Sequence, residues 1–232
     1  MITIVDRPKL KNRAMLSNLA SSGGLVLLLA SVLLPLFLPK WAKFSFVMMA
    51  VGLGTAMVGI YFANRWVRRP RPEDRLDQAL KPLNDSHHLF HYPALPCDHV
   101  LLTPNGVVLL ETVNLGGEFY YQNQRWKEAM TMGRAIRFIV EEHLGDPIRS
   151  VRQTENYLRE RLHKELASDL SIPIKSIVVF IHPGAHLEME ETPIPVCKAD
   201  KLRKQIVIQG PKLDPEVYDR LDGFFRSATL GK

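Results

Sequence analysis

Two long stretches without a charged residue, 14–39 and 44–64, constrain this chain of 232 residues more than any other feature. A helix needs about 20 mostly apolar residues to cross a hydrocarbon core of about 30 Å. The second stretch meets this length directly, and the first meets it if its polar segment 17–22 lies at the membrane interface. The sequence therefore predicts a hairpin of two transmembrane helices, at about residues 20–39 and 44–64.

The first stretch follows basic residues, as the apolar part of a signal peptide does. However, Pro39-Lys40-Trp41 is a poor small-residue cleavage site, and a second apolar stretch follows at once. Trp41 and Trp66 flank the second stretch, where aromatic belts lie in membrane proteins. We therefore predict a membrane anchor over residues 1–66, with the lipid bilayer as its partner, and a separate domain over residues 67–232.

Basic residues are distributed unequally around the two predicted spans. The turn between them carries only Lys40 and Lys43. The outer flanks carry eight basic residues: Arg7, Lys9, Lys11, Arg13, Arg65, Arg68, Arg69 and Arg71. Because cytoplasmic loops are enriched in Lys and Arg, this predicts a multi-pass protein of the cell inner (plasma) membrane, with its N-terminus and C-terminal domain in the cytoplasm.

Small residues lie at regular spacing on the second predicted helix. They are Gly52, Gly54, Ala56 and Gly59. Small residues let helix backbones approach closely in a membrane. The pattern fits either close packing within the hairpin or dimerisation between two chains.

The formal charge of +6 belongs to the anchor rather than to the domain. Six basic residues and one acid give residues 1–64 a charge of +5, whereas 20 basic residues and 23 acids give residues 72–232 a charge of −3. The charge therefore does not itself indicate a nucleic-acid partner. The two cysteines, Cys97 and Cys197, are too few for a disulfide framework and fit a reducing compartment.

The region after residue 72 has the alternation of a soluble α/β domain. Apolar, β-prone runs predict strands, and amphipathic runs with capping residues predict helices. The predicted strands are 99–103, 107–113, 118–122, 136–141, 176–181 and 195–197, and the predicted helices are 73–80, 147–166, 198–205 and 215–227. This order predicts a mixed sheet with helices packed against it.

A β-hairpin carries the strongest candidate site. Asn105-Gly106 between two apolar runs predicts a two-residue turn with Pro104 opposite Val107. In that register Asp98 lies opposite position 113, and Glu111 faces the same side of the sheet. Two converging carboxylates suit a hard cation such as Mg²⁺, although from spacing alone two solvent-facing acids are the commoner case.

The segment from Asp98 to Asn114, which reads DHVLLTPNGVVLLETVN, resembles the core of the nuclease-related domain (NERD) family. That family is similar to the restriction-endonuclease-like PD-(D/E)xK nucleases. Gly117 and Trp126 extend the resemblance, as do the acidic helix opening at Glu73 and the helix opening at Asp146-Pro147. It implies a restriction-endonuclease-like mixed sheet flanked by helices, metal binding by Asp98 and Glu111, an accessory role for Glu73, Mg²⁺ as cofactor, and DNA or RNA as partner.

This sequence departs from the family pattern at the residue on which catalysis depends. The family's Glu-x-Lys motif implies a lysine at position 113, where this chain has Val113. That lysine would orient the attacking water and stabilise charge that develops on the phosphate. Ser150 is a second departure, because the family's helix tends to carry a glutamine there; a shifted register would use Gln153.

Three functions follow from these departures. The favoured hypothesis is a degenerate nuclease, a pseudoenzyme that is weak or inactive and retains metal or nucleic-acid binding. The second is an active Mg²⁺-dependent nuclease in which Lys127 or Arg125 replaces the lost lysine. The third is a non-enzymatic membrane scaffold that binds a protein partner, which the −3 charge of residues 72–232 favours over the second.

Histidine and cysteine residues gather just before the hairpin. His88, His91, Cys97 and His99 can be drawn as four zinc ligands. The spacing is not that of a zinc finger, and no second pair of cysteines or histidines supports it. We therefore interpret this segment as a polar loop that leads into a strand.

Overall fold

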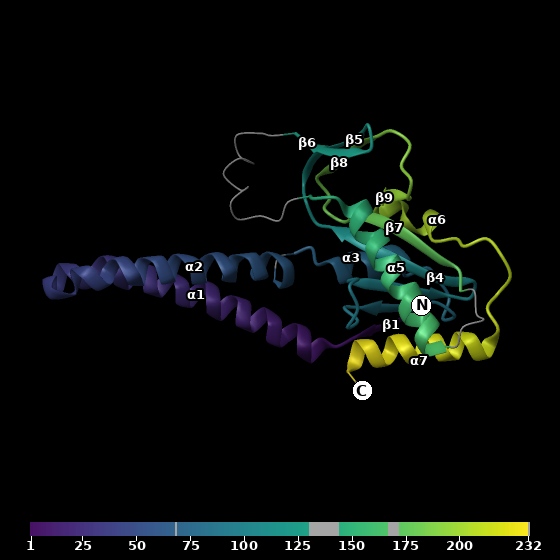
Figure 1. Ribbon diagram of the computed structural model, residues 1–232, viewed down its shortest axis with the longest axis horizontal. Coiled ribbons are helices and arrows are strands. Elements are labelled where there is room, and N and C mark those ends of the chain that lie inside the picture. Colours follow the sequence, from purple (N-terminus) through teal and green to yellow (C-terminus); the bar gives the residue numbers. More distant parts are fainter. Residues whose placement is uncertain (68, 130–143, 167–171, 232) are drawn as a thin grey trace. The chain divides into compact units, whose positions relative to one another are not determined.

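The computed structural model describes residues 1–67, 69–129, 144–166 and 172–231 (Figure 1). These residues form two compact units. One is a pair of helices within residues 7–71, and the other combines residues 1–6 with the described residues from 72 onward. The strand predicted at 136–141 lies outside the described residues.

The helical unit consists of α1 (Arg7–Phe37), a short 3₁₀ turn (Pro39–Trp41) and α2 (Ala42–Trp66). Both helices are long and apolar enough to cross a membrane by length and composition. Their large apolar side chains point outward, as Leu36 at 73% and Phe46 at 72% exposure illustrate, while Ser17, Gly24 and Ser31 of α1 are buried. This distribution is typical of helices that pack through small residues and turn their large side chains toward lipid.

Glycines bring α1 and α2 into backbone contact. A Cβ at Gly24 would overlap the backbone of Ala56, and one at Gly59 would overlap that of Ser21. A Cβ at Gly52 would lie 3.0 Å from the amide nitrogen of Leu28. Three of the four small positions predicted on the second helix are thus used within the hairpin, whereas Gly54 has nothing within 4 Å of an added Cβ. Dimerisation through these positions stays a prediction.

Within its described residues, the second unit contains two sheets and four α-helices. The larger sheet has the strand order β1 (Ile2–Val5), β2 (His88–His91), β3 (His99–Thr103), β4 (Gly106–Val113), β7 (Ile174–Phe180) and β9 (Val196–Lys198). The smaller sheet has the order β6 (Arg125–Glu128), β5 (Gly117–Gln122) and β8 (Ala185–Met189). The helices are α3 (Pro72–Leu80), α5 (Pro147–Leu166), α6 (Leu202–Gln205) and α7 (Pro215–Leu230). The predicted α/β class with a mixed, helix-flanked sheet is confirmed.

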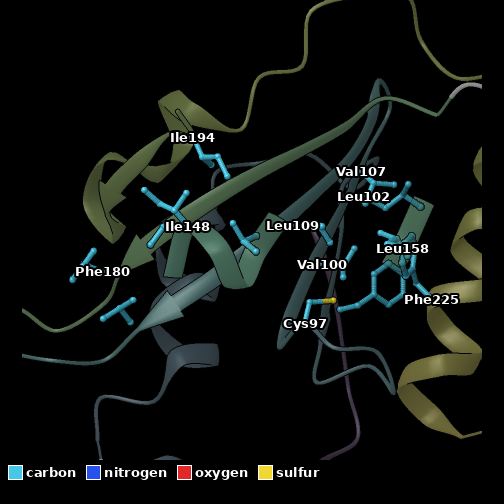
Figure 2. Close-up of a cluster of buried hydrophobic side chains, with 14 of the residues drawn as sticks. Cys97, Val100, Leu102, Val107, Leu109, Ile148, Leu158, Phe180, Ile194 and Phe225 are labelled. Atoms are coloured by element: carbon cyan, nitrogen blue, oxygen red, sulfur yellow. The ribbon is translucent and has the colours of Figure 1, made fainter. Parts of the chain in front are cut away.

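Helices cover both faces of the larger sheet because its side chains alternate. Val100 and Leu109 pack with α5 and α7 in one buried cluster, whereas Leu101 packs with α3 and α6 in another. Figure 2 shows the first cluster, with Cys97, Val100 and Phe225 near one end and Phe180 and Ile194 near the other. Strands buried on both faces explain why 107–110 reads as a continuous apolar run.

The strand β1 differs from the prediction, which assigns residues 1–66 to the anchor. It pairs in parallel with β2, from Ile2 opposite His88 to Val5 opposite His91. Ile4 is 6% exposed and belongs to the same buried cluster as Phe90. The chain therefore enters the sheet, leaves it for the two long helices, and returns to the same unit at α3.

Substituting Ile4→Ala should lower the free energy of unfolding of the full chain by about 2–5 kcal/mol, because it leaves a cavity beneath β1. Ile2→Ala is the matched control on the same strand, since Ile2 is 40% exposed, and it should cost about 0.5 kcal/mol or less. Denaturant unfolding in detergent measures both. Equal effects at the two positions would contradict the burial of Ile4.

Substituting Gly24→Ala should destabilise the helix pair by about 1–3 kcal/mol, because the added methyl group must push the backbone of Ala56 away. The neighbouring Gly23→Ala is the control, since an added Cβ there has nothing within 4 Å. Alanine is the better helix former, so this control should melt at the same or a higher temperature. Thermal unfolding of the full chain in detergent distinguishes the two variants.

Candidate functional site

The turn between β3 and β4 differs from the predicted one. Thr103 pairs with Gly106, so the turn residues are Pro104 and Asn105, and the predicted pairing of Pro104 with Val107 is wrong. The fixed φ of proline suits the second position of a β-turn, and glycine is favoured at the fourth. The positive φ of 148° therefore falls on Gly106, whose missing Cβ also leaves room for the carbonyl of Pro173.

This corrected register brings the two candidate carboxylates closer than predicted. The last pair of the ladder is His99 with Leu110, so the next residues outward are Asp98 and Glu111, directly across from each other. The observed register places residue 111, rather than residue 113, opposite Asp98. Because side chains alternate along a strand, this shift of two residues leaves Asp98 and Glu111 on the same side of the sheet. The backbone N–H of Tyr92 donates to the carbonyl of Asp98 at 2.6 Å and holds this end of β3 against β2.

The first turn of α5 supplies a partner for Glu111. The hydroxyl of Ser150 donates to Glu111 Oε1 at 3.0 Å. The helix begins as predicted, because Asp146 accepts from the backbone N–H of Arg149 at 3.0 Å as an N-cap and Pro147 follows it. Ser150 rather than the exposed Gln153 therefore lies next to the carboxylate.

Glu73 is linked to the hairpin through Tyr92, a residue that no sequence motif indicated. The hydroxyl of Tyr92 donates to Glu73 Oε2 at 2.8 Å, and the backbone of Tyr92 bonds Asp98 as described above. Tyr92 has a positive φ of 54°, which is uncommon for a bulky side chain. No sequence signal indicates such a backbone conformation at a tyrosine.

Position 113 faces the same side as Glu111, but its side chain belongs to the apolar core. Val113 is 8% exposed and packs in the buried cluster that includes Ile148 of α5. It offers no donor or charge. The family resemblance implies a lysine at this position, so the effect of Val113 on catalysis depends on whether another basic group lies at the site.

The two predicted substitutes, Arg125 and Lys127, lie on β6. Trp126 between them packs against Tyr121 at 5.2 Å and Phe180 at 5.8 Å between ring centroids. Because successive side chains of a strand alternate, Arg125 and Lys127 point to the other, exposed side of β6. Within the described residues, neither forms an ion pair with Asp98 or Glu111.

The histidines before the hairpin form no common site. His91 Nδ1 lies 2.8 Å from His99 Nδ1, and His91 Nε2 lies 3.2 Å from Asp77 Oδ1. His88 instead contacts Asp222 of α7 at 2.6 Å. Across the part of the chain that the structure describes, no three or more His, Cys, Asp or Glu residues are grouped to hold a metal ion.

The donors at the hairpin nevertheless fit one kind of ion. Asp98, Glu111 and the Ser150 hydroxyl offer only oxygen atoms, which hard cations prefer. Mg²⁺ is commonly held by one or two carboxylates, with water completing its shell. The residues therefore suit Mg²⁺ better than zinc.

The negative charge at this site affects a neighbouring thiol. Burial, followed by the nearby carboxylate of Asp98, raises the pKa of Cys97 from 9.0 to about 12, and Glu111 adds a smaller effect. Cys97 is 3% exposed. The pKa of Cys197 is also raised, to about 11, chiefly by burial.

Comparison with known families identifies this arrangement. Residues 71–181 match the family model of the nuclease-related domain (NERD). The matched stretch runs from α3 to β7, so it contains Glu73, Asp98, Glu111 and Ser150. This stretch is therefore a nuclease-related domain, and the resemblance inferred from the hairpin is confirmed. No curated protein and no solved structure matches the chain.

The raised pKa of Cys97 predicts a pH dependence of stability. The unfolded thiol titrates near 9.0 and the folded one near 12, so the unfolded state alone releases a proton between these values. The stabilisation that comes from keeping the Cys97 thiol protonated is complete below pH 9.0, and it is lost as the pH rises toward 12. The stability of wild type relative to Cys97→Val should fall by about 1.4 kcal/mol per pH unit in this window. Denaturant titrations at several pH values measure it, and a constant difference would contradict the burial of the thiol.

Proposed function

We propose that this chain is a membrane-anchored, nuclease-related protein whose phosphodiester-hydrolysing site is degenerate and cuts nucleic acid weakly or not at all. The observation that carries the proposal is Val113, 8% exposed in the apolar core on the face where Glu111 lies. The family resemblance implies a lysine there. The pair of carboxylates that hydrolysis requires is retained. The lysine side chain that hydrolysis also requires is absent from position 113.

The residues present support part of the expected chemistry. Asp98 and Glu111 would hold a divalent ion, which when bound supplies charge neutralisation and orientation of water. Ser150 fixes one oxygen of Glu111. A lysine would add a donor aimed at the attacking water and the phosphate, and loss of one such preorganised group typically costs about a hundredfold or more in rate.

The geometry of β6 weighs against Arg125 and Lys127 as the relocated basic group. Arg125 and Lys127 share the exposed side of that strand, opposite the packed ring of Trp126. The charge of −3 over residues 72–232 gives nucleic acid no general attraction to the domain. The same charge favours a second candidate function, a scaffold that binds a protein through the degenerate site.

We also propose that α1 and α2 cross the inner (plasma) membrane. Their length, composition and outward-facing apolar side chains support this. Both ends of the helix pair connect to the unit that contains β1 and α3, so both must lie on one side of the membrane. The excess of basic residues at those ends makes that side the cytoplasm.

Cleavage of labelled DNA and RNA by the full chain, with Mg²⁺ or Mn²⁺, tests the proposal. Truncation at residue 67 is unsuitable, because it removes β1. Wild type should cleave little or nothing. Val113→Lys should raise the rate about a hundredfold or more, whereas Val113→Met, similar in length but uncharged, should not.

The competing functions give different results in the same assay. Robust cleavage by the wild type that is lost in Glu111→Ala would contradict the proposal. If Lys127→Ala or Arg125→Ala also abolishes this cleavage, that residue is the relocated basic group. Absence of cleavage together with absence of salt-dependent nucleic-acid binding would favour the scaffold. Thermal unfolding of each variant checks that it is folded.

A further inference from the structure

Basic side chains surround one end of the helix pair. We call Arg7, Lys9, Lys11, Arg13, Arg69 and Arg71 the basic collar. Arg7, Lys9, Lys11 and Arg69 are exposed, and Arg13 and Arg71 are half-buried. Asp6 is the one acid in residues 1–71 of the sequence, and the opposite end of the helix pair carries only Lys40 and Lys43.

The packing register of α1 and α2 brings the two halves of the collar to one level. Gly24 faces Ala56, Gly52 faces Leu28 and Gly59 faces Ser21, so the residue numbers of each pair add to 80. The Arg13 guanidinium lies 4.7 Å from the centroid of the Trp66 ring and nearly continues this register. Arg13 of α1 therefore lies beside the end of α2, and Arg69 and Arg71 follow α2 within five residues.

The length of the helices sets this level relative to a bilayer. At about 1.5 Å per residue, the charge-free part of α1 from 14 to 37 is about 36 Å long, and Trp41 and Trp66 are separated by about 37 Å. The hydrocarbon core is about 30 Å thick, and the headgroup layers extend the bilayer to about 40–45 Å. Arg13, Trp66 and the collar thus fall in the headgroup layer, where lipid phosphates lie.

We propose that the basic collar is a binding site for the headgroups of anionic phospholipids in the cytoplasmic leaflet. The proposal rests on the membrane insertion proposed above. Lys9 and Lys11 supply exposed charges, and the stacking of Arg13 on Trp66 holds a planar set of donors that suits a phosphate. Each basic residue near a membrane surface contributes about fivefold to attraction of anionic lipid.

Quenching of single tryptophans by brominated lipids tests the site. The full chain would retain Trp66 alone (Trp41→Phe, Trp126→Phe) or Trp41 alone (Trp66→Phe, Trp126→Phe). Each would be reconstituted in vesicles that mix brominated phosphatidylglycerol or brominated phosphatidylcholine with unlabelled phosphatidylcholine. Trp66 should select the glycerol lipid at least fivefold over the choline lipid, and Trp41 should select it less.

Two matched double variants isolate the collar. Lys9→Gln/Lys11→Gln should lower the selectivity at Trp66 at least fivefold, whereas Lys40→Gln/Lys43→Gln removes the same charge from the other end and should leave it unchanged. Equal effects of the two variants, or quenching of both tryptophans without lipid selectivity, would overturn the site but not the membrane insertion. Absence of quenching at both tryptophans would overturn both proposals. If millimolar soluble glycerol phosphate abolishes the preference of Trp66 for phosphatidylglycerol, the collar binds free phosphates. That result would overturn the assignment of the collar to lipid headgroups.

Discussion

The pairing of β1 with β2 is the interaction on which the rest of the architecture depends. The four residues of β1, which precede the long helices, complete the edge of the larger sheet, and one of them, Ile4, is buried. Because β1 precedes α1 and α3 follows α2, the chain leaves the unit that contains the larger sheet, forms the helix pair, and returns to that unit. The contact also reaches the site, because the Thr3 hydroxyl donates to Asp77 at 2.9 Å, Asp77 contacts His91, and His91 contacts His99, the neighbour of Asp98. A continuous polar chain thus connects the strand before the helix pair to the hairpin that carries the carboxylates.

The hairpin shows how the nuclease-related domain accommodates a valine where the family resemblance implies a catalytic lysine. Asp98 and Glu111 lie where β3 and β4 part, and Ser150 fixes one of them from α5. Val113 contributes to the apolar core instead, where it packs with α5. Replacing a lysine with a valine at this position removes a charge from beside buried apolar side chains, so it does not conflict with folding. The proposed loss of catalysis therefore requires no loss of the fold.

Much of this fold is predictable from the sequence, because long periodic segments show their apolar faces. The strand 99–103 follows from its apolar run, the helix 147–166 from its apolar spacing and Asp146 cap, and the two long helices from their charge-free stretches. β1 and β2 have only four residues each, and β1 lies directly before a helix. β8 is as long as β3, but it is mostly exposed and has no continuous apolar run. The register of the hairpin was predicted wrongly because Asn105-Gly106 is a strong turn signal, while Pro104 moved the turn back by one residue. The contact between Ser150 and Glu111 joins residues 39 apart and arises only when α5 packs on the sheet.

The proposed topology places the nuclease-related domain and both ends of the helix pair on one side of a membrane. Single cysteines at Ile2→Cys, Trp41→Cys and Val207→Cys, in exposed positions, can be labelled in sealed vesicles with a membrane-impermeant thiol reagent. Cys97 and Cys197 are buried and have raised pKa values, so they add little background. We expect positions 2 and 207 to be labelled from the same side and position 41 from the opposite side. Labelling of positions 2 and 207 from opposite sides, or of all three from one side, would contradict it.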